Sequence, residues 1–124
     1  CRTNNTFSIW GSLMIDIREA SATIADTTAT SDAVELALGQ LMGLIFPASM
    51  TGTTMTFTMC QTLGGTYVGV KDVGGAADYS VTVTSSKYVP LDPRIFAGCK
   101  YVKLVSGSSE TGAKVITCVI RPVM

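Results

Sequence analysis

The chain has 124 residues, enough for one ordinary domain and too few for two. Its formal net charge is zero, only 15% of its residues are charged, and it has no histidine. This composition excludes the serine–histidine and cysteine–histidine pairs of many hydrolases and gives no support to nucleic-acid binding. The abundance of threonine and serine favours strands and turns.

The two halves of the chain differ in charge. Residues 1–60 hold two basic and five acidic residues, whereas residues 61–124 hold seven basic and four acidic ones. Opposite charges of this kind could pair within one molecule or head to tail between copies. Scattered surface charges are the alternative, because exposed ion pairs contribute only about 0–1 kcal/mol each.

Residues 1–12 are predicted to form an N-terminal arm, and residues 13–124 a single domain. The arm holds the one tryptophan of the chain. Phe7, Ile9 and Trp10 make it apolar, so we expect it to pack either on its own domain or on a neighbouring molecule.

Alternation of apolar and polar residues predicts the strands of the first half. Residues 13–17 alternate and are expected to form a strand, and residues 21–32 are expected to be a polar connection. Residues 33–38 and 41–46 alternate less clearly, and a helix is the alternative there. We favour two short strands, because each glycine of this segment would destabilise a helix interior by about 1 kcal/mol.

The second half reads as strands joined by glycine-rich and proline-rich turns. Pro90 and Pro93 argue against strand pairing over residues 88–96 and favour a short helical turn after Asp92. Further strands are expected at residues 53–60, 67–72, 80–84, 101–105 and 114–121, with a Gly-Gly hairpin after the first of them and a loop over 106–112. The pattern predicts an all-β fold, a single-domain antiparallel β-sandwich or jelly roll of seven or eight short strands.

The four cysteines, Cys1, Cys60, Cys99 and Cys118, have spacings that do not fit a zinc site. We expect reduced thiols packed as small apolar side chains, and one or two disulfides are the alternative. The chain begins with Cys1, as a lipid-bearing bacterial surface protein does after processing, so a lipidated surface domain is a further alternative.

Few residues could carry acid–base or metal chemistry. Ser85, Ser86 and Lys87 form a close serine–lysine grouping, but neighbours on an extended chain point to opposite faces. Asp72 and Asp78 flank a Gly-Gly turn and could help to hold Ca²⁺, although aspartates that form turns are more common. We therefore expect no enzyme activity, no metal and no cofactor. No apolar run approaches the length of a membrane span, so no membrane partner is expected.

A carbohydrate-binding surface would need exposed aromatic side chains. Tyr67 and Tyr101 each start a strand beside valine and are expected in the core or at a sheet edge, whereas Tyr79 and Tyr88 are expected to be exposed. Two scattered tyrosines make a weak sugar platform. A receptor- or carbohydrate-binding module of a tail, fibre or cell surface is therefore the alternative function.

A series of motifs resembles small virion proteins of tailed phages that decorate or cement the head. The most specific motif, PxxFAGxxYxKLxSG, runs from Pro93 to Gly107 and follows Val89-x-Leu91. Upstream stand SxAVxL, LxGLIxPA, MTF before a Gly-Gly turn and a tyrosine, and VxDxG, and downstream stands AxVI. The resemblance spans roughly residues 31–122. It departs after Pro47-Ala48, where an aromatic anchor is often expected and Ser49 and Met50 stand.

The resemblance implies a β-sandwich without catalytic residues that binds the outer surface of a tailed-phage head and stabilises it. We accordingly expect the major capsid protein as partner, a homo-oligomer, synthesis in the host cytoplasm and a final place on the capsid surface of the virion. A cement protein acts at many identical sites, so each contact can be weak. We expect the arm and the loop 88–96 to supply the contacts, through Phe7, Ile9, Trp10, Tyr88, Leu91 and Arg94.

Overall fold

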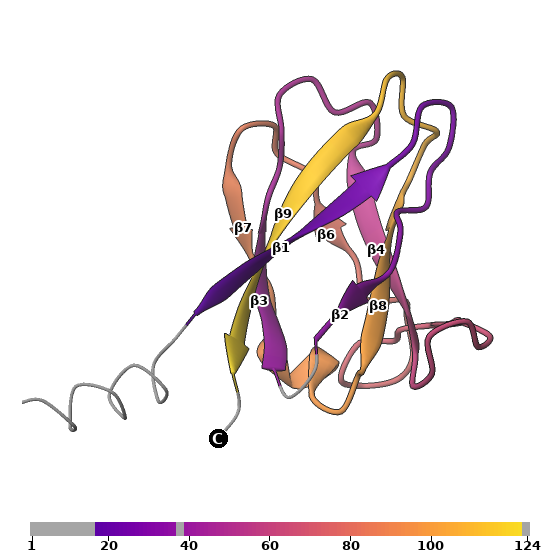
Figure 1. Ribbon diagram of the computed structural model, residues 1–124, viewed down its shortest axis with the longest axis vertical. Coiled ribbons are helices and arrows are strands. Elements are labelled where there is room, and N and C mark those ends of the chain that lie inside the picture. The colour runs from indigo at the N-terminus through magenta and orange to yellow at the C-terminus, as the bar shows by residue number, and fades with distance from the viewer. Residues whose placement is uncertain (1–16, 37–38, 123–124) are drawn as a thin grey trace, which may run out of the picture.

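The computed structural model describes residues 17–36 and 39–122, which form an antiparallel β-sandwich (Figure 1). The predicted fold class is confirmed, with nine strands in these residues instead of seven or eight. The elements are β1 (Arg18–Ile24), β2 (Val34–Glu35), β3 (Gly39–Ile45), β4 (Thr54–Cys60), β5 (Val68–Gly69), β6 (Val81–Thr82), β7 (Tyr88–Pro90), the 3-10 helix η1 (Pro93–Phe96), β8 (Tyr101–Ser106) and β9 (Lys114–Pro122).

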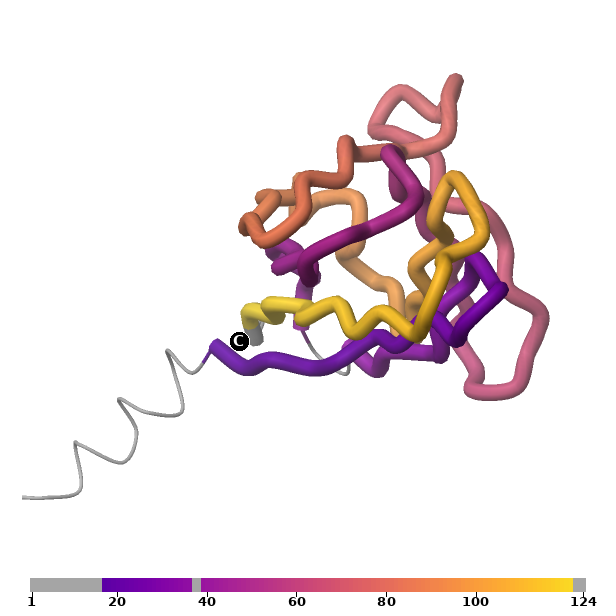
Figure 2. Tube along the Cα trace, turned by 90° about the horizontal axis from the view of Figure 1, so that it is seen from above, coloured from indigo at the N-terminus to yellow at the C-terminus, as the bar shows by residue number. Residues whose placement is uncertain are grey.

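The strands are divided between two sheets. Sheet A has the order β1-β9-β3-β7, and sheet B has the order β2-β8-β4-β5, with β6 also pairing with β4. Viewed from above, β1 and β9 run side by side in one layer (Figure 2). The first and last strands of the described residues are thus neighbours, and long-range pairing holds the sandwich together.

Alternate residues of the longer strands point into one core between the sheets. In β1 the side chains of Ala22 and Ile24 are fully buried, whereas those of Glu19 and Ser21 point outward. Each large apolar side chain buried in this way contributes about 1.5–3 kcal/mol to folding. The inward residues of the longest strands are Ile116, Cys118 and Ile120 of β9, Leu41 and Leu44 of β3, Met55 and Phe57 of β4, and Val102 and Leu104 of β8.

Two segments differ from the sequence prediction. Residues 21–24 belong to β1 rather than to a polar connection, because small and β-branched side chains alternate inward there against β9. The predicted strand 13–17 lies outside the described residues except for Ile17. Tyr88–Pro90 forms β7, although proline argued against pairing over residues 88–96. Strand pairing is possible because β7 is the edge of sheet A and needs hydrogen bonds on one side only.

The remaining predicted elements occur close to their expected places. The segments 33–38 and 41–46 correspond to β2 and β3, so the preference for strands over a helix was right. The helical turn with proline at its start is η1, and Asp92 caps it. The return strand predicted for 67–72 is much shorter, because only Val68 and Gly69 pair with β4. No helix in the described part of the chain is long and apolar enough to cross a membrane.

Candidate interaction site

The structure places three of the six predicted contact residues. Tyr88 lies on β7 with 50% of its side chain exposed, and Arg94 lies exposed on η1. Leu91 is only 6% exposed and packs in the core, so it holds the loop 88–96 in place and does not present its side chain to a partner. The three predicted residues of the N-terminal arm lie outside the described residues.

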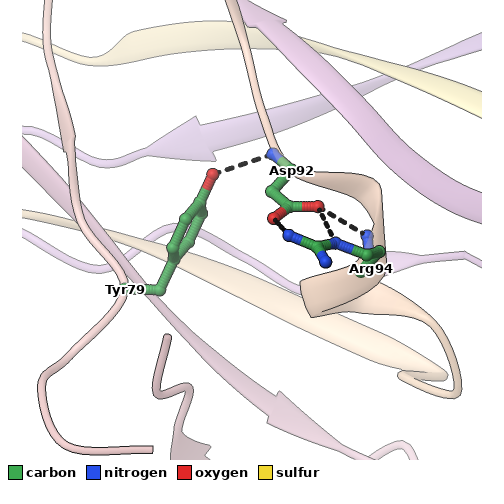
Figure 3. Close-up of polar contacts among 3 residues, drawn as sticks. All are labelled: Tyr79, Asp92 and Arg94. Atoms are coloured by element: carbon green, nitrogen blue, oxygen red, sulfur yellow. Dashed lines mark hydrogen bonds and ion pairs between the residues drawn. The ribbon is translucent and has the colours of Figure 1, made fainter. Parts of the chain in front are cut away.

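The start of η1 is fixed by hydrogen bonds that Figure 3 shows. The backbone N–H of Asp92 donates to the hydroxyl of Tyr79 at 2.9 Å. The carboxylate of Asp92 accepts from the backbone N–H of Arg94 at 3.1 Å, from its Nε at 3.1 Å and from its Nη2 at 2.8 Å. These bonds from Arg94 lower the pKa of Asp92, and the same pair raises the pKa of Arg94. The guanidinium is therefore exposed but held in one orientation.

A side-chain amide joins the turn after η1 to a second turn. Gln61 Nε2 donates to the carbonyl of Gly98 at 2.8 Å, and Gln61 Oε1 accepts from the backbone N–H of Lys100 at 3.1 Å. The second turn carries Leu63, whose side chain is 65% exposed. We call residues 61–65 together with 93–100 the η1 end. It presents the exposed side chain of Leu63 and the exposed cations Arg94 and Lys100, a combination that suits contact with another protein.

The outward face of sheet A is uncharged over most of its area. Register places Ser21, Thr117, Ile45 and Tyr88 in one row across β1, β9, β3 and β7. The next row consists of Glu19, Val119, Gly43 and Pro90. Ile45 is 37% exposed and Val115, further along β9, is 50% exposed. Apolar and hydroxyl side chains thus cover the centre of this face.

Tyr88 lies flat on this face over a glycine. A Cβ atom on Gly43 would overlap the ring and hydroxyl of Tyr88, so the absence of a side chain at position 43 makes room for the ring. Tyr88 pairs with Ile45, and Gly43 is the next outward position of β3. The arrangement resembles the cross-strand packing of an aromatic ring on glycine that stabilises sheet edges.

Aromatic rings elsewhere are less available than expected. Tyr79 was predicted to be exposed, but it is partly buried, because its ring packs on Phe57 at 5.7 Å and on Phe96 at 5.9 Å between centroids. The Lys103 ammonium lies 4.4 Å from the centroid of the Tyr67 ring and covers it. Burial raises the pKa of Tyr67, with a further contribution from Cys60 and Tyr101.

The thiols of Cys60, Cys99 and Cys118 are free and buried, as predicted. Burial, and secondarily the charge of Asp32, raises the pKa of Cys118 to about 12, and burial also raises the pKa of Cys99. Because the thiolate is the reactive form, these two protonated thiols serve as packing groups at neutral pH.

The predicted calcium candidates form a turn. The backbone carbonyl of Asp72 accepts from the backbone N–H of Gly75 at 2.9 Å, and the carboxylate of Asp78 pairs with the Lys71 ammonium at 2.7 Å. Within residues 17–36 and 39–122, no group of three or more cysteine, aspartate or glutamate side chains is placed to hold a metal ion.

Sequence reasoning missed Ile45, Leu63 and Val119 as surface residues. The signal for one of them was present in β9, whose run VITCVI is apolar at both inward and outward positions. A strand that is apolar on both faces is typical of one covered on both sides. Leu63 lies in the turn after β4, which Gln61 joins to the turn after η1 by a long-range bond that local patterns do not reveal.

Comparison with known proteins yields a likeness of fold. No protein-family model matches the chain, and no curated protein matches it in sequence. The crystal structure of YomS, a protein derived from the SPBc2 prophage, is similar with a TM-score of 0.53 and 16% sequence identity. The similarity covers 86% of this chain and 95% of YomS. At this identity it shows a shared fold over nearly the whole domain.

Proposed function

We propose that this protein is a structural component of a tailed-phage virion that binds the outside of the head and strengthens it. The fold likeness to a prophage-derived protein and the motif series ending in PxxFAGxxYxKLxSG both support a phage origin. The partner is the major capsid protein, and the place of action is the capsid surface. No catalytic step is part of the proposal.

The observation that carries the proposal is the η1 end. It is a rigid tip, because Asp92 fixes Arg94 and Gln61 joins the two turns. Leu63 presents apolar surface that folding leaves in water, which is favourable only when a partner covers it. A small attachment surface such as the η1 end binds weakly at a single site, but a shell offers many identical sites.

Binding strengthens a shell by mass action. A protein that binds the assembled shell and not its separated subunits adds a stabilising free energy of RT ln(1 + [L]/Kd) per site, about 2.7 kcal/mol at one hundred times Kd. Because an assembled shell offers many such sites, a modest affinity at each site is enough to raise the resistance of the shell to heat and osmotic shock.

Purified protein added to shells that lack it provides the test. We expect co-sedimentation with the shells and a higher temperature of shell rupture. Leu63→Glu and Arg94→Glu should each weaken binding at least several-fold, because one places a charge at an apolar contact and the other reverses the cation. Ser109→Glu, an exposed change in the loop at the opposite end of β8, is the matched control and should bind like the unchanged protein. Absence of binding, or binding without added resistance, would refute the cement role.

The alternative of a carbohydrate-binding module has less support. Lys103 covers the ring of Tyr67, and Tyr79 is partly buried with its hydroxyl bonded to Asp92. Tyr88 lies over Gly43 and is 50% exposed. Saturable binding on a glycan array, lost in Tyr88→Ala, would favour this alternative over attachment to the shell.

A further inference from the structure

The outward face of sheet A has apolar side chains that the described part of the chain leaves uncovered. The exposed ones, Ile45 and Tyr88, stand in one row and Val119 stands beside them. Face-to-face packing of two sheets, about 10 Å apart, is the usual way in which such surfaces are buried. The inward face of sheet A is already packed in the core, whereas residues 17–36 and 39–122 leave its outward face uncovered.

Ile17, the residue before β1, extends the same apolar face. In β1 the inward positions are even-numbered, so Glu19 and Ser21 point outward. Continuing the alternation places Ile17 on the outward side, and its side chain is 64% exposed. Ile17 therefore adds apolar surface at the β1 side of the outward face.

Charge on the face is confined to one corner and consists of one acid and one base. Glu19 and Arg121 lie on adjacent strands, since Glu19 pairs with Val119 and Arg121 is the next outward residue of β9. Neither takes part in an ion pair within the described residues, where the pairs are Lys71 with Asp78 and Arg94 with Asp92. Each copy thus offers both halves of a charge pair.

We propose that the outward face of sheet A binds a second copy of this chain about a two-fold axis. An axis that passes between Glu19 and Arg121 and runs diagonally toward Tyr88 places each acid opposite the base of the other copy. The same axis places Ile45 on Pro90 of the other copy and brings the two Tyr88 rings together. Such an interface is self-complementary, as two-fold symmetry requires, and its uncharged centre brings no like charges together.

The area predicts a reversible dimer. The 7, 9, 7 and 3 residues of β1, β9, β3 and β7, with a rise of about 3.4 Å and a strand spacing of about 4.8 Å, give a face of roughly 400 Å² per copy. Stable complexes bury about 800 Å² per partner. We therefore expect dissociation in the range of about 1–100 µM, and this dimer is independent of whether the proposed attachment to shells is correct.

Sedimentation velocity of the full chain from about 5 to 500 µM is the first measurement. The proposal predicts a shift from monomer to dimer over this range, and a protein that is still monomeric at 500 µM overturns it. Ile45→Glu should abolish the shift. Val68→Glu, the same kind of change at an exposed valine on β5 of sheet B, is the matched control and should leave the shift in place. A dimer that survives Ile45→Glu would also overturn the proposal.

Charge exchange tests the two-fold arrangement. Glu19→Arg and Arg121→Glu, made singly, should each weaken the dimer about tenfold, because two attractive pairs become two repulsive ones. The double variant should regain the original affinity within about threefold. A double variant as weak as the single ones refutes the arrangement, provided that circular dichroism shows each variant folded. If the protein is monomeric and Ile45→Glu abolishes binding to shells, the face belongs to the shell and the dimer proposal is wrong.

Discussion

Glu110 allows the sharpest test of how this sandwich is held together. Its side chain is 1% exposed, and its carboxylate accepts three hydrogen bonds, from the backbone N–H groups of Thr51 (2.8 Å) and Gly52 (2.9 Å) and from the hydroxyl of Ser106 (2.7 Å). It thereby joins the loop 106–112 to the turn before β4. We predict that Glu110→Gln, which keeps the shape and removes the charge, destabilises the fold strongly.

The magnitude follows from the three bonds. A hydrogen bond to a charged group contributes about 1.5–3 kcal/mol, and a buried donor left without a partner costs about 1–3 kcal/mol. The glutamine amide still accepts with its oxygen, but its NH₂ group faces a donor in either orientation. We therefore expect a loss of about 2–4 kcal/mol in the free energy of unfolding, which lowers the Tm by roughly 10 °C for a domain of this size.

The pH dependence gives an independent signature. Burial acts to raise the pKa of Glu110, but the hydrogen bonds from Thr51, Gly52 and Ser106 outweigh it and hold this pKa below its usual value. A carboxyl with a lowered pKa in the folded state stabilises the fold above its unfolded pKa, about 4.3, and loses this effect as the pH falls through the folded value. The gap between the original protein and Glu110→Gln should therefore be full at pH 7 and shrink below about pH 4.

Urea unfolding at pH 7 and pH 3, followed by circular dichroism, measures both effects. Glu35→Gln, the same change at an exposed glutamate of β2, is the matched control and should shift stability by less than about 0.5 kcal/mol. A loss for Glu110→Gln no larger than that of the control would refute the role of the carboxylate. A large loss that is the same at both pH values would refute the assignment of its charge.

Three further predictions follow from named contacts. Gly43→Ala should displace the Tyr88 ring and cost about 1 kcal/mol in urea unfolding. Ring NMR shifts of Tyr88, assigned by comparison with Tyr88→Phe, that are the same as in the original protein would contradict it. Tyr79→Phe should cost about 1 kcal/mol in urea unfolding, because it leaves the backbone N–H of Asp92 without its acceptor, and an unchanged midpoint would count against this. Cys118 should resist iodoacetamide at pH 8 in the folded protein and react in urea, since its pKa is raised to about 12, and fast native labelling detected by mass spectrometry would disprove this.

The sequence predicted the sandwich because its strongest signals are local. Alternation in β4, the Gly-Gly turn after it and the proline at the start of η1 each report on backbone geometry within a few residues. The choice of strands for β2 and β3 was correct for the same reason, since glycine disfavours a helix wherever it stands. Buried free thiols were also predictable, because cysteine in an apolar strand packs as a small hydrophobic residue.

Long-range pairing explains what the sequence did not reveal. Ala20 and Ala22 are weak strand formers, and β1 exists because β9 pairs with it along its length. Pro90 occurs in a strand because β7 lies at a sheet edge, a position known only once the sheet order is known. Tyr79 is partly buried because Phe57 and Phe96 come together around it from distant parts of the chain.

The candidate site was likewise predictable from the sequence only in part. Exposure of Tyr88 and Arg94 was predictable from the loop in which they stand, whereas the burial of Leu91 depends on its backbone N–H bonding to the carbonyl of Met42 in β3. That carbonyl is available because β3 has an irregular register between Leu41 and Gly43, where an additional residue is accommodated. Such an irregularity has no clear sequence signature, so the position of the loop had to come from the structure.

The two surfaces would act together in a single mechanism if both proposals hold. A dimer joined through sheet A carries two η1 ends, so one weak contact with a shell raises the effective concentration of the second contact to the millimolar range. The gain depends on geometry, because the spacing of the two tips must match the spacing of sites on the shell. Loss of dimerisation in Ile45→Glu would then weaken attachment to shells although position 45 is far in sequence from Leu63 and Arg94. The hydroxyl-rich, charge-poor strands suit both tasks, because a surface with few charges can be buried without stripping water from ions.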